Sequence, residues 1–253
     1  MLLRRVIEHV KAQNWTAVAL DFVIVVVGVF IGIQVANWND GLADRAKEVQ
    51  ALEGLRSDFE QMEVTLNRAV AFHERAFAGL HAVIKAIEEG ELTDTDRPQF
   101  EDGLRYCYRT AAVTAVSSTL TELSSSGQIG LLRDATLRKA LTEYEIFRES
   151  EKFGHQAVRD MILLYTRDCT AHFDYDIYAN RPGTYDDSAW AFRLSEIGDY
   201  DFEEMKKDED FREAMFELRE FQLFDLNWYL NARQRVKDIR RLLDGDAPED
   251  TAR

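Results

Sequence analysis

The sequence contains few of the residues that interrupt helices. Among its 253 residues are 3 prolines and 13 glycines. Proline breaks a helix and glycine weakens one, so this scarcity favours long helices over a turn-rich β fold. Hydrophobic residues make up 46% and charged residues 30% of the chain, proportions typical of a folded protein rather than a disordered one.

Basic residues are scarce relative to acidic ones. The chain has 31 lysines and arginines against 46 aspartates and glutamates, and its formal net charge is -15. Proteins that bind nucleic acid use a basic surface to displace counterions from the phosphates. We therefore expect no nucleic-acid partner for this acidic chain.

Sequence motifs of the common catalytic and metal centres are also missing. The sequence has no Gly-x-Ser-x-Gly, no Walker loop, no dinucleotide-binding glycine motif and no His-Glu-x-x-His. No acidic residue precedes a histidine by three positions, as carboxylate-bridged di-iron bundles require. Cys169-x-x-His172 is the nearest metal-like cluster, and it has too few soft ligands for zinc. We expect no cofactor, no metal and no catalytic site, and we interpret His73 and His155 as packing or surface residues.

One long apolar run is present near the N-terminus. Every residue of Phe22–Ala36 is apolar or glycine except Gln34. Trp15 and Trp38 flank the run, 23 residues or about 34 Å of helix apart, which suits a hydrocarbon core of roughly 30 Å with a tryptophan at each interface. The sequence predicts a transmembrane helix over residues 16–38. Its expected interface anchors are Trp15, Asn37, Trp38, Asn39 and Asp40.

Two alternatives to a retained anchor fit the residues less well. A cleaved signal peptide needs a small residue at the third position before the cut, where Gln34 stands, and a buried core helix rarely shows so continuous an apolar run. Lysine and arginine counts on the two sides of the helix are equal, so the positive-inside rule does not decide the orientation. Because Arg4, Arg5 and the terminal amine outweigh Glu8, we place residues 1–15 in the bacterial cytoplasm and the large domain outside the inner membrane.

One face of the predicted anchor carries small residues. Gly28 and Gly32 form a small-xxx-small pair, and Asp21 and Asn39 fall on nearly the same side of the helix. Such glycines let a second helix approach closely, which makes this face a candidate contact for a homodimer or a partner membrane protein. The alternative is that glycine is simply common in membrane helices and that Asp21 reaches for the interface. The sequence leaves both interpretations open.

The remaining chain shows helical periodicity in four long stretches. Apolar residues recur at steps of three and four, and Gly90 and Gly245 lie where helices are expected to end. Gly127 is expected to form a structural turn. The sequence predicts an all-α fold, in which the transmembrane helix is followed by an antiparallel bundle of about four long helices over residues 39–244 and a disordered tail over 245–253. The expected helices cover residues 42–89, 99–116, 134–178 and 208–243, with a short polar helix between the second and the third.

The two cysteines, Cys107 and Cys169, can pair only if the fold brings them together. In a simple helical hairpin that turns near residue 130, they lie 23 and 39 residues from the turn. That mismatch of 16 residues corresponds to about 24 Å of helix, far beyond the reach of a disulfide. We expect two free, mostly buried thiols. A more complicated topology would reverse this expectation.

Two stretches resemble a known family. VIVVVGVFIGIQVANWND is similar to the N-terminal anchor of a bacterial family of membrane proteins of unknown function, whose anchors close in Asn-Trp-Asn-Glu. LTELSSSGQIGLLRDATLRKALTEYE resembles the second block of that family. The matching residues are Leu123, Ser125, Ser126, Gly127, Leu131, Leu137, Arg138, Leu141 and Tyr144. Asp40 and Leu132 depart mildly from the family pattern, which has Glu and Ile there. The resemblance implies a single-pass anchor with a helical domain, and it implies no activity.

These features favour a non-enzymatic scaffold of the bacterial envelope, which binds envelope proteins through its acidic helical domain. A ligand-sensing bundle is the alternative, and it would signal through a partner membrane protein because no second apolar run returns to the membrane. A third hypothesis is an enzyme that uses the acidic and aromatic loop 180–207. The residues of that third site would be Tyr175, Asp176, Tyr185, Asp187 and Trp190, and they assemble no nucleophile, base and oxyanion donor.

Overall fold

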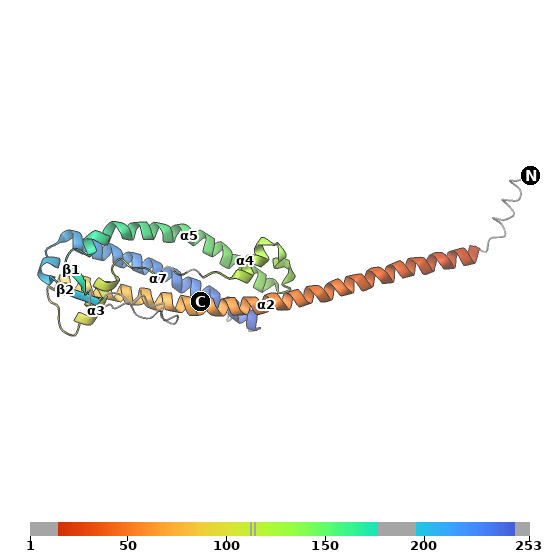
Figure 1. The fold of residues 1–253 in the computed structure, drawn as a ribbon, viewed down its shortest axis with the longest axis horizontal. Coiled ribbons are helices and arrows are strands. Elements are labelled where there is room, and N and C mark those ends of the chain that lie inside the picture. The colour runs from red at the N-terminus through yellow and green to blue at the C-terminus, as the bar shows by residue number, and fades with distance from the viewer. Residues whose placement is uncertain (1–14, 112, 114, 177–195, 246–253) are drawn as a thin grey trace, which may run out of the picture. The chain divides into compact units, whose positions relative to one another are not determined.

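The computed structural model describes residues 15–111, 113, 115–176 and 196–245, except for the side chains of 15–19, 21 and 151–153. Most of these residues are helical, in agreement with the all-α class that the sequence predicts. Contacts divide the chain into two compact units, Met1–Leu52 and Glu53–Arg253. The elements in chain order (Figure 1) are α2 (Trp15–Glu89), α3 (Arg97–Tyr106), α4 (Ser118–Ser125), the 3-10 helix η1 (Gln128–Leu131), α5 (Ala135–Cys169), β1 (Phe173–Asp176), β2 (Glu196–Tyr200), α6 (Phe202–Met205) and α7 (Glu209–Asp244).

The described part of the first unit is the N-terminal half of α2. Its large apolar side chains between Phe22 and Val35 are each at least 47% exposed. Water does not favour so continuous an exposed apolar surface. Among the described residues, α2 is also the one helix that is long and apolar enough to cross a membrane, by length and composition. The prediction of a long apolar N-terminal helix is therefore confirmed.

In the second unit, the C-terminal half of α2 packs against α7. Arg56 donates two hydrogen bonds to the carbonyl oxygen of Leu243, and further along His73 Nδ1 lies 2.7 Å from Gln222 Oε1. Since the residue numbers rise along α2 as they fall along α7, the two helices are antiparallel. The facing side of α2 is buried at three-four spacing, as its sequence predicts. This buried stripe comprises Leu55, Phe59, Met62, Leu66, Ala69, His73, Ala76, Leu80, Val83 and Ile87.

Helix α5 runs beside α7 in the opposite direction (Figure 1). Phe147 stacks on Trp228 with ring centroids 5.7 Å apart, and Tyr165 meets Phe221 at 6.2 Å. The helix begins after Asp134, whose carboxylate accepts hydrogen bonds from two backbone amides of the first turn. The sequence offers Asp134 or Thr136 as the cap of this helix, and the structure shows Asp134 in that position.

The predicted second long helix is wrong in length. α3 ends at Tyr106 rather than near Val116, and the described residues of 109–117, here called the connecting segment, are not helical. Three of its carbonyl oxygens accept hydrogen bonds from the long helices, because a backbone that leaves a helix needs other donors when it is buried. The donors are Gln222 to Arg109, Tyr229 to Ala111 and Tyr144 to Ala115. Three helices longer than 30 residues are present in the described parts of the chain, so a bundle of about four is not confirmed.

The expected separation of the cysteines is also wrong. Cys107 Sγ and Cys169 Sγ lie 2.8 Å apart, and both residues are free and buried in the structure, as expected of the thiols themselves. A non-helical chain advances up to about 3.3 Å per residue, against 1.5 Å in a helix. The connecting segment therefore covers as much length as a helix of about twice as many residues. This extra reach places Cys107 level with the end of α5.

Helices α2 and α3 cross at a pair of glycines. A Cβ added to Gly79 would lie 2.5 Å from the backbone nitrogen of Gly103 and 2.8 Å from its Cα. No side chain fits between backbones this close, so both positions require glycine. The crossing lies beside the main apolar core of the unit, to which Leu80, Phe100, Leu104, Phe211 and Met215 contribute.

A small antiparallel hairpin follows α5. Phe173 of β1 pairs with Tyr200 of β2, and its ring is buried in the core. The sequence predicts a helix continuing towards residue 178 and a loop over 180–207. In the structure the helix ends at Cys169, and the end of the predicted loop forms β2 and α6. Residues 177–195 lie outside the described part of the chain.

Among the described residues, three glycines adopt the left-handed conformation that other residues resist. Gly127 has a φ of 68° and joins α4 to η1, while Gly90 and Gly245 follow the ends of α2 and α7 with φ values of 74° and 85°. These are the positions at which the sequence indicates a turn or a helix end.

Candidate functional site

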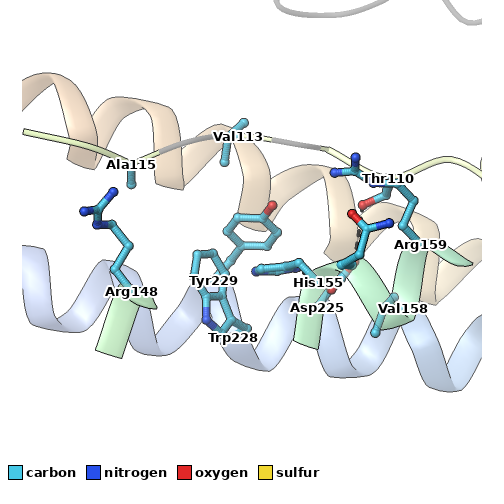
Figure 2. Close-up of a pocket in the computed structure, with 11 residues that line it drawn as sticks. Thr110, Val113, Ala115, Arg148, His155, Val158, Arg159, Asp225, Trp228 and Tyr229 are labelled. Carbon is cyan, nitrogen blue, oxygen red and sulfur yellow. Dashed lines mark hydrogen bonds and ion pairs between the residues drawn. The ribbon is translucent and has the colours of Figure 1, made fainter. Parts of the chain in front are cut away.

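A cavity of about 230 Å³ lies where the connecting segment passes α5 and α7 (Figure 2). Pockets for drug-sized molecules have volumes of about 300–1,000 Å³, so this one suits a small metabolite rather than a nucleotide cofactor. The lining residues are Thr110, Val113 and Ala115 of the connecting segment, Arg148, His155, Gln156, Val158 and Arg159 of α5, and Asp225, Trp228 and Tyr229 of α7.

His155 and Asp225 form an acid–base pair in the cavity wall. His155 Nδ1 lies 3.2 Å from Asp225 Oδ1, and the Thr110 hydroxyl donates to Asp225 Oδ2 at 3.2 Å. Asp225 is only 2% exposed, which is rare for a carboxylate unless it is paired. The three residues come from α5, α7 and the connecting segment, so the site exists only when all three elements are packed.

Aromatic rings fix the position of His155. Its ring stands edge-on to Trp228, with centroids 4.1 Å apart, and lies 5.6 Å from the ring of Tyr229 (Figure 2). The Tyr229 hydroxyl donates to the carbonyl oxygen of Ala111 at 2.5 Å. Burial raises the pKa of Tyr229 well above its usual range, so the hydroxyl keeps its proton and remains a donor. The tyrosine thus ties α7 to the connecting segment next to the cavity.

Behind the cavity, Gln222 links α2 to the connecting segment. Its amide oxygen lies 2.7 Å from His73 Nδ1, and its amide nitrogen donates to the Arg109 carbonyl at 2.7 Å. Because the amide oxygen only accepts, the geometry assigns a proton to His73 Nδ1. His73 and Gln222 are buried, and the His73 ring stacks on Tyr229 at 5.0 Å. The ring of Tyr229 therefore lies against the rings of both His73 and His155.

Three buried polar atoms of the cavity wall, each on a different side chain, lack a hydrogen-bond partner within the described chain. His155 Nε2 and Trp228 Nε1 are buried and have no hydrogen-bond partner within the described chain. Asp225 Oδ1 is within ion-pair distance of His155 but accepts no well-aligned hydrogen bond. Most buried polar atoms in native proteins are paired, because an unpaired one costs about 1–3 kcal/mol. A small side-chain movement would bring these atoms to the surface of the cavity, where a polar guest could bond to them.

The charges of the wall favour an anion. Arg148 and Arg159 bring two positive charges, while the one carboxylate, Asp225, is already engaged by His155 and Thr110. This local positive charge occurs in a chain whose formal net charge is -15. A guanidinium group forms strong charge-assisted hydrogen bonds with carboxylates and phosphates.

The arrangement suits binding better than group transfer. A histidine oriented by an aspartate is half of a nucleophilic triad, and the third member must lie within reach of the histidine. Here Thr110 bonds to Asp225 instead of His155, and no described hydroxyl or thiol hydrogen-bonds His155 Nε2. The described residues also contain no group of three histidine, cysteine or acidic side chains that could hold a metal ion.

Of the residues that the sequence singled out, His155 lines this cavity, whereas the described candidates on the anchor and in the acidic loop do not. Around Gly28 and Gly32, an added Cβ would meet nothing within 4 Å. The side chains of Trp15 and Asp21 lie outside the described part, as do Tyr185, Asp187 and Trp190, while Tyr175 and Asp176 lie in β1. The expected interface residues Asn37, Trp38, Asn39 and Asp40 are exposed on α2.

The sequence did not indicate the polar residues of the site on α7, because the buried face of this helix is rotated away from its most apolar positions. The apolar residues of this helix at three-four spacing include Phe221 and Trp228, yet the buried positions between 218 and 232 are 218, 222, 225, 226, 229 and 232. Strict three-four spacing from Leu218 would have placed Gln222 and Asp225 in the core. A polar residue in a buried stripe is the signal that could have revealed them.

No family model, no curated protein and no solved structure matches this chain. The resemblance to the bacterial membrane family therefore stays a prediction. The interpretation of the cavity depends on its own geometry and charge.

The buried His73 makes the stability of the second unit depend on pH. Burial lowers the pKa of His73 below its usual value of 6.5, with Asp225 opposing and His155 adding to this effect. Because the unfolded chain binds this proton more readily, the free energy of unfolding should fall as the pH drops below about 6.5. Urea unfolding of the full chain in detergent between pH 7.5 and 5 measures this loss.

The control for that experiment is His73→Gln, which keeps a polar partner for Gln222 but does not titrate. The pKa values of Asp58 and Asp208 are also lowered, but carboxyl groups bind protons, and so affect stability, only near pH 4 and below. The slope between pH 7.5 and 5 should therefore be smaller in the variant. An equal slope in both proteins would assign the pH dependence to another group.

Proposed function

We propose that this chain is a membrane-anchored protein whose helical domain binds a small organic anion in the cavity between α5, α7 and the connecting segment. The observation that carries the proposal is the cavity itself, whose wall combines Arg148 and Arg159 with a buried His155–Asp225 pair and apolar side chains. A scaffold needs no such cavity. Of the functions that the sequence suggests, ligand sensing fits this feature best.

The ligand that matches the wall is a carboxylate or phosphate on a small, partly apolar body. Arg148 and Arg159 stand at opposite ends of the cavity (Figure 2), and either guanidinium would bind the anionic group. Val113, Ala115 and Val158 provide apolar surface for the remainder of the molecule. The volume of about 230 Å³ limits the ligand to a small metabolite.

The anchor supports a location in a bacterial inner membrane with the helical domain outside the cytoplasm. The exposed apolar side chains of α2 support the membrane part, and the flanking charges support the orientation. The resemblance to a single-pass membrane family adds to the support for the membrane part. Protease digestion of a tagged domain in spheroplasts tests on which side of the membrane the helical domain lies. Survival of the tag until lysis would contradict a location outside the cytoplasm.

A sensing role requires a route from the cavity to the membrane. In this proposal the domain is an up-down helical bundle. The second of its four segments consists mostly of the connecting segment and not of a long helix. A ligand that bridges this segment to α5 and α7 would change how tightly the three elements pack. The anchor would transmit the change through a second copy of the chain or a partner membrane protein at the Gly28–Gly32 face.

Binding can be measured as a shift in melting temperature of the full chain in detergent, with a panel of small carboxylates and phosphates. At a concentration one hundred times the Kd, a ligand raises the free energy of unfolding by about 2.7 kcal/mol, or the melting temperature by about 5–10 °C. Arg159→Gln should weaken the binding of an active compound about tenfold or more, because a charge-assisted hydrogen bond contributes about 1.5–3 kcal/mol.

The matched control is Arg167→Gln, which removes the same charge from an exposed position of α5 that does not line the cavity. This variant should bind as the wild type does. Equal weakening in both variants would show a general charge effect rather than a site. If no carboxylate or phosphate in the panel shifts the melting temperature, the proposed anion site is wrong.

A further inference from the structure

Cys107 and Cys169 are brought together although 62 positions separate them. Cys107 directly follows α3, and Cys169 is the last residue of α5. Their sulfur atoms are 2.8 Å apart, closer than two non-bonded sulfurs rest against each other. The Cys169 thiol can donate to the carbonyl oxygen of Thr166 at 3.4 Å, which leaves Cys107 as the donor between the two sulfurs. Atoms already in contact need only a small side-chain movement to bond.

The surroundings of the pair fit a covalent link better than a metal site. Both side chains are completely buried in the apolar core, next to Leu104 and Phe173. A zinc site needs about four ligands, and the nearby His172 is bonded to Asp208 at 2.7 Å instead. Within the described chain no third metal ligand joins the two sulfurs.

We propose that Cys107 and Cys169 form an intramolecular disulfide that fastens the end of α3 to the end of α5. The proposal is independent of the anion site, since it rests on the two sulfur atoms alone. A disulfide would link two elements covalently, which two free thiols in a core do not do. A bond here fixes the point from which the connecting segment leaves α3.

The co-reactant is a disulfide, either that of an oxidoreductase or that of oxidised glutathione. The thiolate of one cysteine attacks a sulfur of this disulfide, whose S–S bond breaks and releases one thiol. The second cysteine then attacks the mixed disulfide, the Cys107–Cys169 bond forms, and a second thiol leaves. The two protons of the protein thiols end on the two released thiols. Two electrons pass from the protein to the co-reactant.

Burial decides when this exchange can occur. Burial and the contact with Cys169 raise the pKa of Cys107 well above its usual value, so the folded protein holds little thiolate. The exchange therefore takes place while the chain folds or when the connecting segment opens. Once formed, the bond is shielded from reductants by the same core.

The test is a count of free thiols in the full chain, which has two cysteines in total. The protein in detergent is equilibrated with a reduced and oxidised glutathione buffer until its state is constant, quenched with acid, unfolded and labelled with a maleimide. We expect no label before reduction and two labels after it, on a monomer. Trypsin should release the peptide 106–109 linked to the peptide that begins at Asp168.

Two free thiols at equilibrium, or glutathione on either cysteine without the 107–169 link, would overturn the proposal. The oxidised wild type should also melt about 10 °C above its reduced form, because a disulfide across a loop of this length restricts the unfolded chain. Cys107→Ala and Cys169→Ala should each abolish this difference between oxidising and reducing conditions. A difference that persists in either variant would count equally against the disulfide.

Discussion

Replacing Gly103 with alanine is expected to lower the free energy of unfolding by about 3 kcal/mol. Overpacking in a core costs about 1–3 kcal/mol, and this position belongs at the upper end because the obstacle is the backbone of Gly79 rather than a side chain that can rotate. Alanine is the better helix former by about 1 kcal/mol, yet this gain cannot offset the separation of two helices. Urea unfolding of the full chain in detergent, followed by circular dichroism, measures the loss.

Gly130→Ala is the matched control for this variant. A Cβ added at Gly130 would meet nothing within 4 Å, so its stability should stay within about 0.5 kcal/mol of the wild type. Gly79→Ala should match Gly103→Ala, since the two glycines face each other. If Gly103→Ala is as stable as the wild type, the close crossing of α2 and α3 is incorrect.

Replacing Gln222 with leucine is expected to cost about 3 kcal/mol of stability. The two side chains are similar in size, so the loss comes from hydrogen bonds rather than from a cavity. The substitution leaves His73 Nδ1 and the Arg109 carbonyl oxygen without a partner, and each buried unpaired group costs about 1–3 kcal/mol. Thermal and urea unfolding of the full chain measure the difference.

Gln234→Leu provides the control on the same helix. Gln234 is exposed and bonds only to Asp238 at 2.9 Å, so its replacement should change stability by less than about 0.5 kcal/mol. In the double variant His73→Leu with Gln222→Leu, the cost should be smaller than the sum of the two single variants by about 1–2 kcal/mol. Additive costs would mean that the two side chains do not interact.

The helices and their ends could be predicted because they depend on neighbouring residues. The three-four spacing of α2 identified its buried face, and Asp134 marked the start of α5 through hydrogen bonds to its own first turn. Gly90 and Gly245 marked helix ends because left-handed backbone conformations favour glycine. The apolar run of the N-terminal helix needed no tertiary contact to be recognised.

The connecting segment could not be predicted, because distant side chains determine it. Its own residues are compatible with a helix, and its carbonyl groups are satisfied instead by Gln222, Tyr229 and Tyr144. The separation expected for the cysteines was wrong for the same reason, since it assumed a helix over these residues.

The sequence by itself determined the apolar N-terminal helix, the helical class and the caps, since each depends on residues within one or two turns of one another. Only the tertiary structure decided where α3 ends, that Cys107 meets Cys169, and that His155 and Asp225 share a cavity. Those features join three elements separated by tens of residues. Local periodicity carries no information about such pairings, because they follow from how the whole unit packs.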